Sequence, residues 1–229
     1  MSLSRGLVGH WSLDEESYNP ATKRFTDKSA YNNHGTSANA ASFVADRMGQ
    51  ADRAMDFNRS SDYVDCGNGD SLDITDEITI AVWVKLNNLP QYQRVVSRQY
   101  NGINTANSIF QLGMVNAGVN KGFRWSVGNT FDHWDGTPQT NIWYHVVGTY
   151  NKVTAELYVD NDKLWSDNFT DPIRVSNVEP LIIGAQSYLG NLDHYTDGSL
   201  ADVRIYNRVL SEAEITLLYE SYRPKTIIA

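Results

Sequence analysis

Short runs of alternating apolar and polar residues recur along this chain, separated by Gly, Pro, Asn and Asp. The longest run covers residues 78–86. A period of two places every second side chain on one face of a strand, so this run predicts a strand with one buried face and one mixed face. The predicted buried face consists of Ile78, Ile80, Val82, Val84 and Leu86.

Many short strands without intervening helical periodicity predict an all-β fold in which two antiparallel sheets pack as a β-sandwich. A polar turn at 58–62 joins two of the runs, and this pattern favours a hairpin. Asp160 and Asn161 predict a tight turn between two others. The further strands are predicted at residues 7–13, 54–57, 63–66, 94–98, 108–115, 122–127, 142–150, 154–160, 163–165, 181–184 and 200–206.

One segment has helical rather than strand periodicity. Ser211 and Glu214 have the spacing of a capping box, in which each side chain bonds the backbone N–H of the other residue. The sequence therefore predicts one short C-terminal helix beside the sandwich. Its apolar positions recur three or four residues apart, as Ile215, Leu218, Tyr219 and Tyr222.

Length and charge narrow the class of protein. A chain of 229 residues without an evident linker or repeat predicts a single domain over residues 1–229, with its core at about 6–220. The net charge of −8 disfavours nucleic acid as a partner. We expect no membrane insertion and no signal peptide here, because no apolar stretch is long enough. Cys66 is the single cysteine and has no internal disulfide partner.

Eight segments of the chain form a recognisable series: residues 6–15, 27–35, 54–57, 62–64, 78–85, 143–150, 157–160 and 199–211. Taken in this order, they resemble the concanavalin A-like, laminin-G-like family of jelly-roll domains, while residues 92–120 match no family motif. The resemblance implies a jelly-roll sandwich and an extracellular or cell-surface location.

The same resemblance implies a structural calcium ion that ties the N-terminal segment to the last strand. Asp202 resembles the last-strand ligand, and Asp14, Asp27 and a carbonyl near Gly35 are the other candidates. Calcium prefers such carboxylate and carbonyl oxygens. The alternatives are a solvated charge for Asp14, an Asx turn for Asp27, and an ion pair with a nearby arginine for Asp202.

Two polar loops that carry aromatic residues are the candidate ligand sites. Sugar sites combine an aromatic surface with hydrogen-bonding groups, and loops on rigid scaffolds often supply both. Trp134 also fits a residue that folds back onto the sheet edge. The strand residues Trp83, Trp125, Trp143 and His145 are interpreted as packing residues. The candidates are Asp132, Trp134 and Asp135 in one loop, and Tyr188, His194 and Tyr195 in the other.

No catalytic signature is recognisable in the sequence. The Glu-x-Asp-x-x-Glu run of laminarinase-type enzymes and the Gly-x-Ser-x-Gly elbow are both absent. We therefore predict a non-catalytic, lectin-like carbohydrate-binding module. The first alternative is a structural or protein-interaction domain of a larger surface or particle protein, and the second is a glycan-active hydrolase or lyase. The ligand and the oligomeric state stay open.

Overall fold

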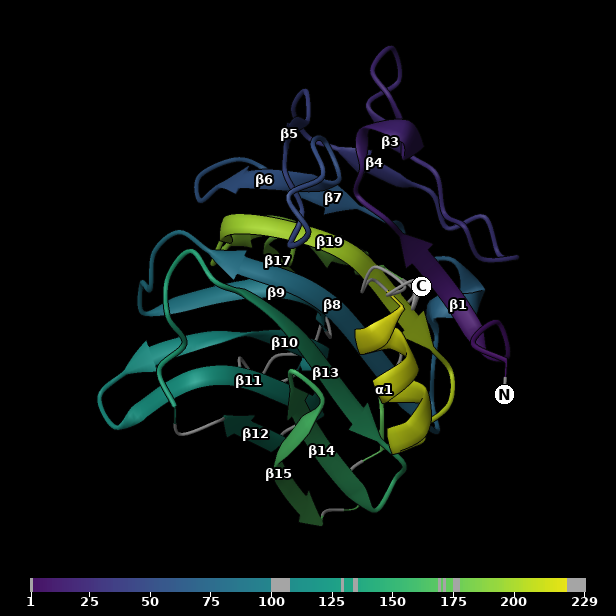
Figure 1. Ribbon diagram of the computed structural model, residues 1–229. Coiled ribbons are helices and arrows are strands. Elements are labelled where there is room, and N and C mark those ends of the chain that lie inside the picture. The colour runs from purple at the N-terminus through teal and green to yellow at the C-terminus, as the bar shows by residue number, and fades with distance from the viewer. Residues whose placement is uncertain are drawn as a thin grey trace, which may run out of the picture.

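The structure is a computed structural model that describes residues 2–99, 108–128, 130–133, 136–168, 170, 172–174 and 178–221. In these residues two large antiparallel sheets form the layers of a β-sandwich, accompanied by a small hairpin and one α-helix (Figure 1). The predicted fold class is confirmed. Two short 3₁₀ helices, Glu15–Ser17 and Asp70–Leu72, interrupt the connections.

Sheet A contains the N-terminal strand and the last strand of the chain. Strand β1 (Leu7–Trp11) pairs with β19, next to the main path of the sheet. In order across the sheet, the other strands are β15 (Asp162–Asn168), β14 (Thr154–Val159), β13 (Trp143–Tyr150), β8 (Ile78–Leu86), β19 (Asp197–Tyr206), β6 (Ala54–Asn58) and β5 (Ser42–Val44).

Sheet B forms the opposite layer, and the hairpin of β17 (Gln186–Tyr188) and β18 (Asn191–Asp193) accompanies it. Three short strands of sheet B come from the long polar segment near the N-terminus, where no strand was predicted. In order, the strands are β12 (Thr130–His133), β11 (Asn120–Gly128), β10 (Ser108–Ala117), β9 (Tyr92–Gln99), β16 (Leu181–Ile183), β7 (Val64–Asp65), β4 (Gly35–Ser37), β3 (Arg24–Phe25) and β2 (Tyr18–Asn19).

Strand β8 confirms the alternation read from the sequence. Its predicted inner residues are at most 1% exposed and belong to the core between the sheets. The opposite face is also covered, since Thr79, Ala81 and Trp83 are at most 5% exposed. The outer side of sheet A therefore carries a second layer of packing.

One tryptophan from sheet B fits against a glycine of sheet A in the core. Trp125 donates from Nε1 to the Thr149 carbonyl at 3.0 Å. A Cβ at Gly148 would lie 2.4 Å from the Trp125 ring, closer than any side chain can approach. Only glycine leaves room for the ring at this position, so this contact fixes how the two sheets align.

The hairpin predicted around residues 58–62 is wrong. Strand β6 pairs with β5 and β19 in sheet A, whereas β7 pairs with β4 and β16 in sheet B. The turn crosses from one sheet to the other. Local alternation identified both strands correctly, but it carries no information about which partner each strand joins.

The tight turn predicted at Asp160 and Asn161 is confirmed. Both residues have positive φ angles, 52° and 77°, between the paired strands β14 and β15. This is the left-handed region that two-residue hairpin turns require, and Asp and Asn tolerate it better than most residues.

Helix α1 (Glu212–Glu220) packs on the outer face of sheet A (Figure 1). Its apolar side chains contact Ala81, Val147, Tyr158 and Tyr206. The predicted capping box is present at Ser211 and Glu214. No helix in the described part of the chain is long and apolar enough to span a membrane.

Candidate functional site

The second candidate loop, which carries Tyr188, His194 and Tyr195, forms the hairpin β17–β18 and its exit. The hairpin is anchored by Glu179, a carboxylate that is 5% exposed. Glu179 accepts hydrogen bonds from the Ser187 hydroxyl and the Leu189 N–H, both at 3.2 Å. These hydrogen bonds hold the loop as an ordered hairpin beside β9 of sheet B.

The exit of the hairpin brings two predicted residues onto sheet B. His194 bonds from Nδ1 to Asp193 at 2.8 Å, and its ring packs edge-on against Tyr92 with centroids 5.4 Å apart. Tyr195 follows directly. Its pKa is raised, first by burial and then by the nearby Tyr63 phenol and Asp193 carboxylate. Tyr195 therefore lies near Tyr63, which follows the sheet crossing.

A buried arginine supports the same region of sheet B. Arg94 is 6% exposed and donates from Nε to the Gln186 side chain at 3.1 Å. Its pKa is lowered to about 10, mainly by burial and then by the charge of Arg124. The register places both residues in line with Gly113 on the strand between them. Two cations thus share the outer side of this sheet.

The first candidate loop is only partly described. Asp132 lies on β12, the edge strand of sheet B, and pairs with Trp125 of β11. Trp134 and Asp135 lie outside the described residues, as do the side chains of Asp132 and Tyr188. Their assignment as ligand residues stays a prediction.

A cleft of about 590 Å³ opens over β4 and β7 at the other end of sheet B. This volume lies in the usual range of small-ligand sites, roughly 300–1,000 Å³. Val64 is fully buried in the core, so Tyr63 and Asp65 must face outward, and Thr36 pairs with Asp65. The described lining consists of Lys23, His34, Thr36, Ser37, Ala38, Tyr63, Asp65 and Gly67.

Hydrogen bonds fix what two cleft residues offer to a ligand. His34 Nδ1 accepts from the Asp27 N–H at 3.1 Å, so a neutral His34 carries its proton on Nε2 and is a donor there. Asp65 accepts from the Gly67 N–H through Oδ1 at 2.8 Å. The cleft thus combines an imidazole N–H, a carboxylate and the Tyr63 phenol.

Sequence reasoning did not single out His34, Tyr63 or Asp65 as site residues. The signal was present, because Tyr63 and Asp65 flank the core residue Val64 and must face away from it. That the Tyr63 phenol influences the pKa of Tyr195 was not readable, since the two positions are far apart in the sequence.

The four candidate calcium ligands do not form a suitable cation site. Asp27 already accepts four hydrogen bonds, from the N–H groups of His10, Ser29 and Asn33 and from the Ser29 hydroxyl. Gly35 lies in sheet B, paired with Phe25. Within the described ranges no group of three or more His, Cys, Asp or Glu side chains is arranged to hold a metal ion.

The remaining two candidates face positive charges of the protein itself. Asp202 lies between His10, at 2.7 Å, and Arg204, at 3.0 Å. Burial raises the pKa of Asp14, but hydrogen bonds from Ser17 and Ser12 and the charge of Lys28 outweigh this, so the pKa is lowered overall. The Arg204 and Lys28 cations compensate the carboxylates that calcium would need. Calcium stays a prediction, and these residues do not fit it.

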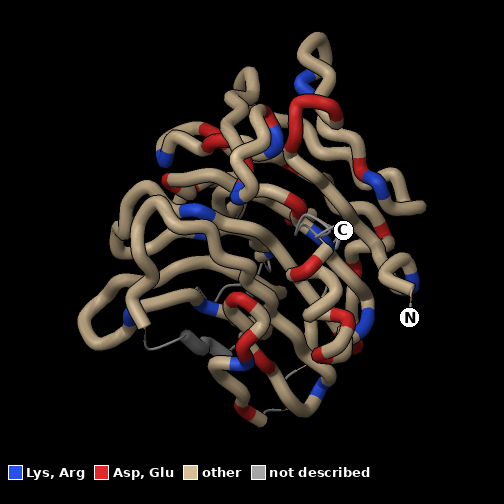
Figure 2. Tube along the Cα trace, viewed as in Figure 1, with Lys and Arg blue, Asp and Glu red and all other residues tan. Residues whose placement is uncertain are grey.

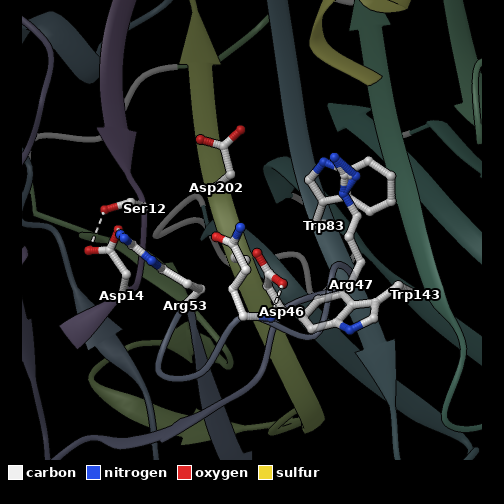
Figure 3. A pocket seen from close by; sticks show the side chains of 10 residues that line it. Ser12, Asp14, Asp46, Arg47, Arg53, Trp83, Trp143 and Asp202 are labelled. Atoms are coloured by element: carbon white, nitrogen blue, oxygen red, sulfur yellow. Dashed lines mark hydrogen bonds and ion pairs between the residues drawn. The ribbon is translucent and has the colours of Figure 1, made fainter. Parts of the chain in front are cut away.

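Asp14 and Asp202 instead line one pocket on the outer face of sheet A, which we call the tryptophan pocket (Figure 3). Asp202 has a φ of 52° at a bulge in β19, and such a bulge re-aims a side chain. The lining is Ser12, Asp14, Asp46, Arg47, Gln50, Arg53, Trp83, Trp143, Ala201 and Asp202.

Charges of both signs are scattered along the chain (Figure 2). Several basic residues form ion pairs within the protein, such as Arg53 with Glu16 at 2.7 Å and Lys163 with Glu212 at 2.9 Å. The acidic balance and these pairs give no support to a phosphate-backbone partner.

An all-β sandwich with a polar cleft on one outer face and a small pocket on the other defines a jelly-roll binding scaffold. The chain belongs to the concanavalin A-like lectin/glucanases superfamily, whose family model matches residues 58–216. The family predicted by resemblance is confirmed.

Similar proteins include toxins and carbohydrate-active enzymes. Paraclostridial mosquitocidal protein 1 of Paraclostridium bifermentans is 30% identical over 90 residues, which are 39% of this chain and 7% of that protein. The crystal structure of its binding domain has a TM-score of 0.70 at 18% identity, covering 96% of this chain and 53% of that chain. The chain therefore spans a small part of this relative and about half of its binding domain.

Two further solved structures share the fold. Domain 4 of an extracellular GH43 arabinanase from Geobacillus stearothermophilus, in complex with arabinotriose, has a TM-score of 0.70 at 15% identity, covering 93% of this chain and 98% of that one. Trypanosoma rangeli sialidase in complex with sialic acid has a TM-score of 0.68 at 20% identity, covering 94% of this chain and 33% of that one.

Proposed function

We propose that the chain is a non-catalytic carbohydrate-binding module that holds its ligand in the cleft over β4 and β7. The cleft itself carries the proposal. It offers a phenol ring, an imidazole donor and a carboxylate acceptor within about 590 Å³. Sugars are recognised by this combination of an aromatic surface with convergent donors and acceptors.

The number of carboxylates in the cleft is our reason for proposing a module without catalytic activity. Hydrolysis of a glycosidic bond generally uses two carboxyl groups that flank the bond. Among the described residues that line the cleft, Asp65 is the single carboxylate. The cleft therefore favours binding over hydrolysis.

The relatives support the same class and a location outside the cell. The arabinanase domain was solved with arabinotriose and belongs to an extracellular enzyme, and the mosquitocidal domain is a binding domain. Carried over to this chain, these facts favour an extracellular or cell-surface module with a glycan or glycosylated receptor as its ligand.

A glycan array followed by calorimetry on the best ligand tests the proposal. We expect Tyr63→Ala to weaken binding roughly tenfold or more, which corresponds to about 1.4 kcal/mol. Asp65→Asn should weaken it through the lost acceptor charge. Tyr31→Ala is the matched control, because Tyr31 is a tyrosine 50% exposed that does not line the cleft.

Two results would count against the proposal. If a glycan binds and both cleft variants retain full affinity, the ligand lies elsewhere. If the array is blank for a folded protein, the carbohydrate proposal is wrong and the protein-interaction alternative is favoured.

A further inference from the structure

The outer face of sheet A holds a site that the cleft does not use. The tryptophan pocket encloses about 140 Å³. A cavity of roughly 150 Å³ holds one benzene ring, so this pocket has room for a single six-membered ring and not for a chain. Figure 3 shows Asp14 and Arg53 on one side, Trp83, Arg47 and Trp143 on the other, and Asp46 and Asp202 between them.

Two neighbouring strands place the aromatic walls. Trp83 of β8 pairs with His145 of β13, so Trp143, two residues earlier, projects on the same side of the sheet. Ala201 of β19 pairs with Trp83 from the other side, and its small side chain leaves space beside the indole.

The Trp83 ring system is covered by two neighbouring side chains. The Arg47 guanidinium lies 3.9 Å from the ring centroid, and the Tyr219 ring stacks on Trp83 at 5.6 Å with an interplanar angle of 17°. A ligand in the pocket therefore meets the edge of Trp83, where its one polar group lies, and the half-buried Trp143.

That polar group is unsatisfied. The side chain of Trp83 is 5% exposed, and its Nε1–H finds no acceptor among the described residues. A buried donor without an acceptor is rare in folded proteins and calls for an explanation, such as a water or a ligand that completes the bonding. His145, whose ring centroid is 4.9 Å away, also has a buried nitrogen, Nδ1, without a partner in the described part of the chain.

The charges of the pocket are balanced within the protein. Asp202 is compensated by Arg204 and also bonds His10, and Asp14 has the nitrogens of Lys28 and Arg53 within 3.7 Å. Asp46 accepts the N–H groups of Met48 and Gln50. A carboxylate keeps further lone pairs after such bonds, which suits hydroxyl donors, and a charged ligand has no net charge to meet.

We propose that the tryptophan pocket is a second saccharide site, which takes one neutral terminal sugar ring through the Trp83 Nε1–H and the carboxylates opposite it. The site rests on the carbohydrate-binding function proposed above, but it lies on the other sheet and works independently of the cleft. The module would then be bivalent, with the cleft on one face and a pocket for a terminal sugar on the other.

Indole NMR of the ¹⁵N-labelled protein tests the site directly. Trp83→Phe removes the N–H while keeping an aromatic ring, and the resonance lost in its spectrum assigns Trp83 Nε1–H. Methyl glycosides of glucose, galactose, mannose and N-acetylglucosamine are titrated in turn, with glycerol as the non-specific polyol. We expect one of them to shift the Trp83 resonance saturably. Trp83→Phe should weaken that sugar roughly tenfold, as measured by calorimetry, because the variant no longer carries the reporting N–H.

Two variants separate this site from the cleft. Trp165→Phe, at a half-buried tryptophan of β15 that does not line the pocket, should bind like the parent protein. Tyr63→Ala should leave the Trp83 shift unchanged. If no sugar moves the Trp83 resonance more than glycerol does, the pocket is not a sugar site, whatever the cleft binds. If the shift occurs but disappears in Tyr63→Ala, the two sites are not independent and the inference is equally wrong.

Discussion

The outer faces of the two sheets differ in kind although their inner faces are alike. Outside sheet A, Ala81 and Val147 pack beneath the apolar side of α1. Outside sheet B, the register aligns Ser97, Gln111 and Ser126, three polar residues that are at most 4% exposed. The outer face of sheet A is partly covered by a helix, whereas that of sheet B carries a row of buried polar side chains across three strands.

This difference indicates which positions distinguish this protein from others of the same fold. Inner positions must be apolar to form the core, so their residues indicate the fold but not the function. Outer positions are free of that requirement. A buried polar row such as the one on sheet B adds no apolar burial, and we interpret it as support for the cleft and hairpin that share its sheet.

The largest expected effect comes from loosening the helix that covers sheet A. Leu218→Ala removes a side chain that is 1% exposed, and we expect a loss of about 2–5 kcal/mol in the free energy of unfolding. Chemical denaturation measures it. Leu217→Ala, next to it but 45% exposed, is the control and should change stability little. Equal losses for both variants would mean that the helix does not pack as described.

The next largest effect concerns the N-terminal cap of α1, whose contribution to stability can be measured apart from that of packing. The pKa of Glu214 is lowered to about 2 from 4.5, chiefly by hydrogen bonds from Arg208. Its carboxylate therefore stabilises the fold above pH 4.5, and this contribution is lost as the pH falls toward 2. We expect Glu214→Gln to cost roughly 1–3 kcal/mol at neutral pH and progressively less on acidification.

Denaturation curves across this pH range measure the cap. Glu212→Gln, in the same turn, should cost far less because its side chain is 70% exposed and its pair with Lys163 lies at the surface. A pH-independent loss in Glu214→Gln would contradict the ionic part of the argument.

A smaller effect is expected on sheet B. The Gln111 Oε1 atom is buried and has no donor within the described ranges. Gln111→Leu removes that unsatisfied atom but also the hydrogen bond from Nε2 to the Ser126 hydroxyl at 3.1 Å. The two effects oppose each other, so stability should change by less than about 1 kcal/mol. Val147→Gln, the reverse exchange on sheet A, should be clearly destabilising. Comparable losses would show that the two faces are not different in kind.

The smallest effect concerns calcium. A cation present at a hundred times its Kd would stabilise the fold by about 2.7 kcal/mol. Since the four candidate ligands do not fit a shared ion, we expect a chelator to leave Tm unchanged in calorimetry. A drop in Tm that added calcium reverses would contradict this expectation and show that the fold binds calcium.

Much of the scaffold was predictable, because alternation in β8 and the capping box at Ser211 are local signals. The pairing of β6 was not, since its partner β19 lies at the far end of the sequence. The sites follow the same division. The outward direction of Asp65 was implied by its neighbour Val64, whereas the meeting of Asp14 with Asp46 depends on how a long loop folds over sheet A.

The contact between Trp125 and Gly148 bears on how the two layers find their alignment as the chain folds. If β13 were shifted by two residues, about 7 Å, relative to sheet B, Val146 or Tyr150 would take the place of Gly148 under the indole. Neither leaves the space that glycine leaves, so a slipped sandwich could not close over the ring. The Trp125 ring therefore selects one alignment of the two sheets, because the neighbouring alignments would cause steric clashes.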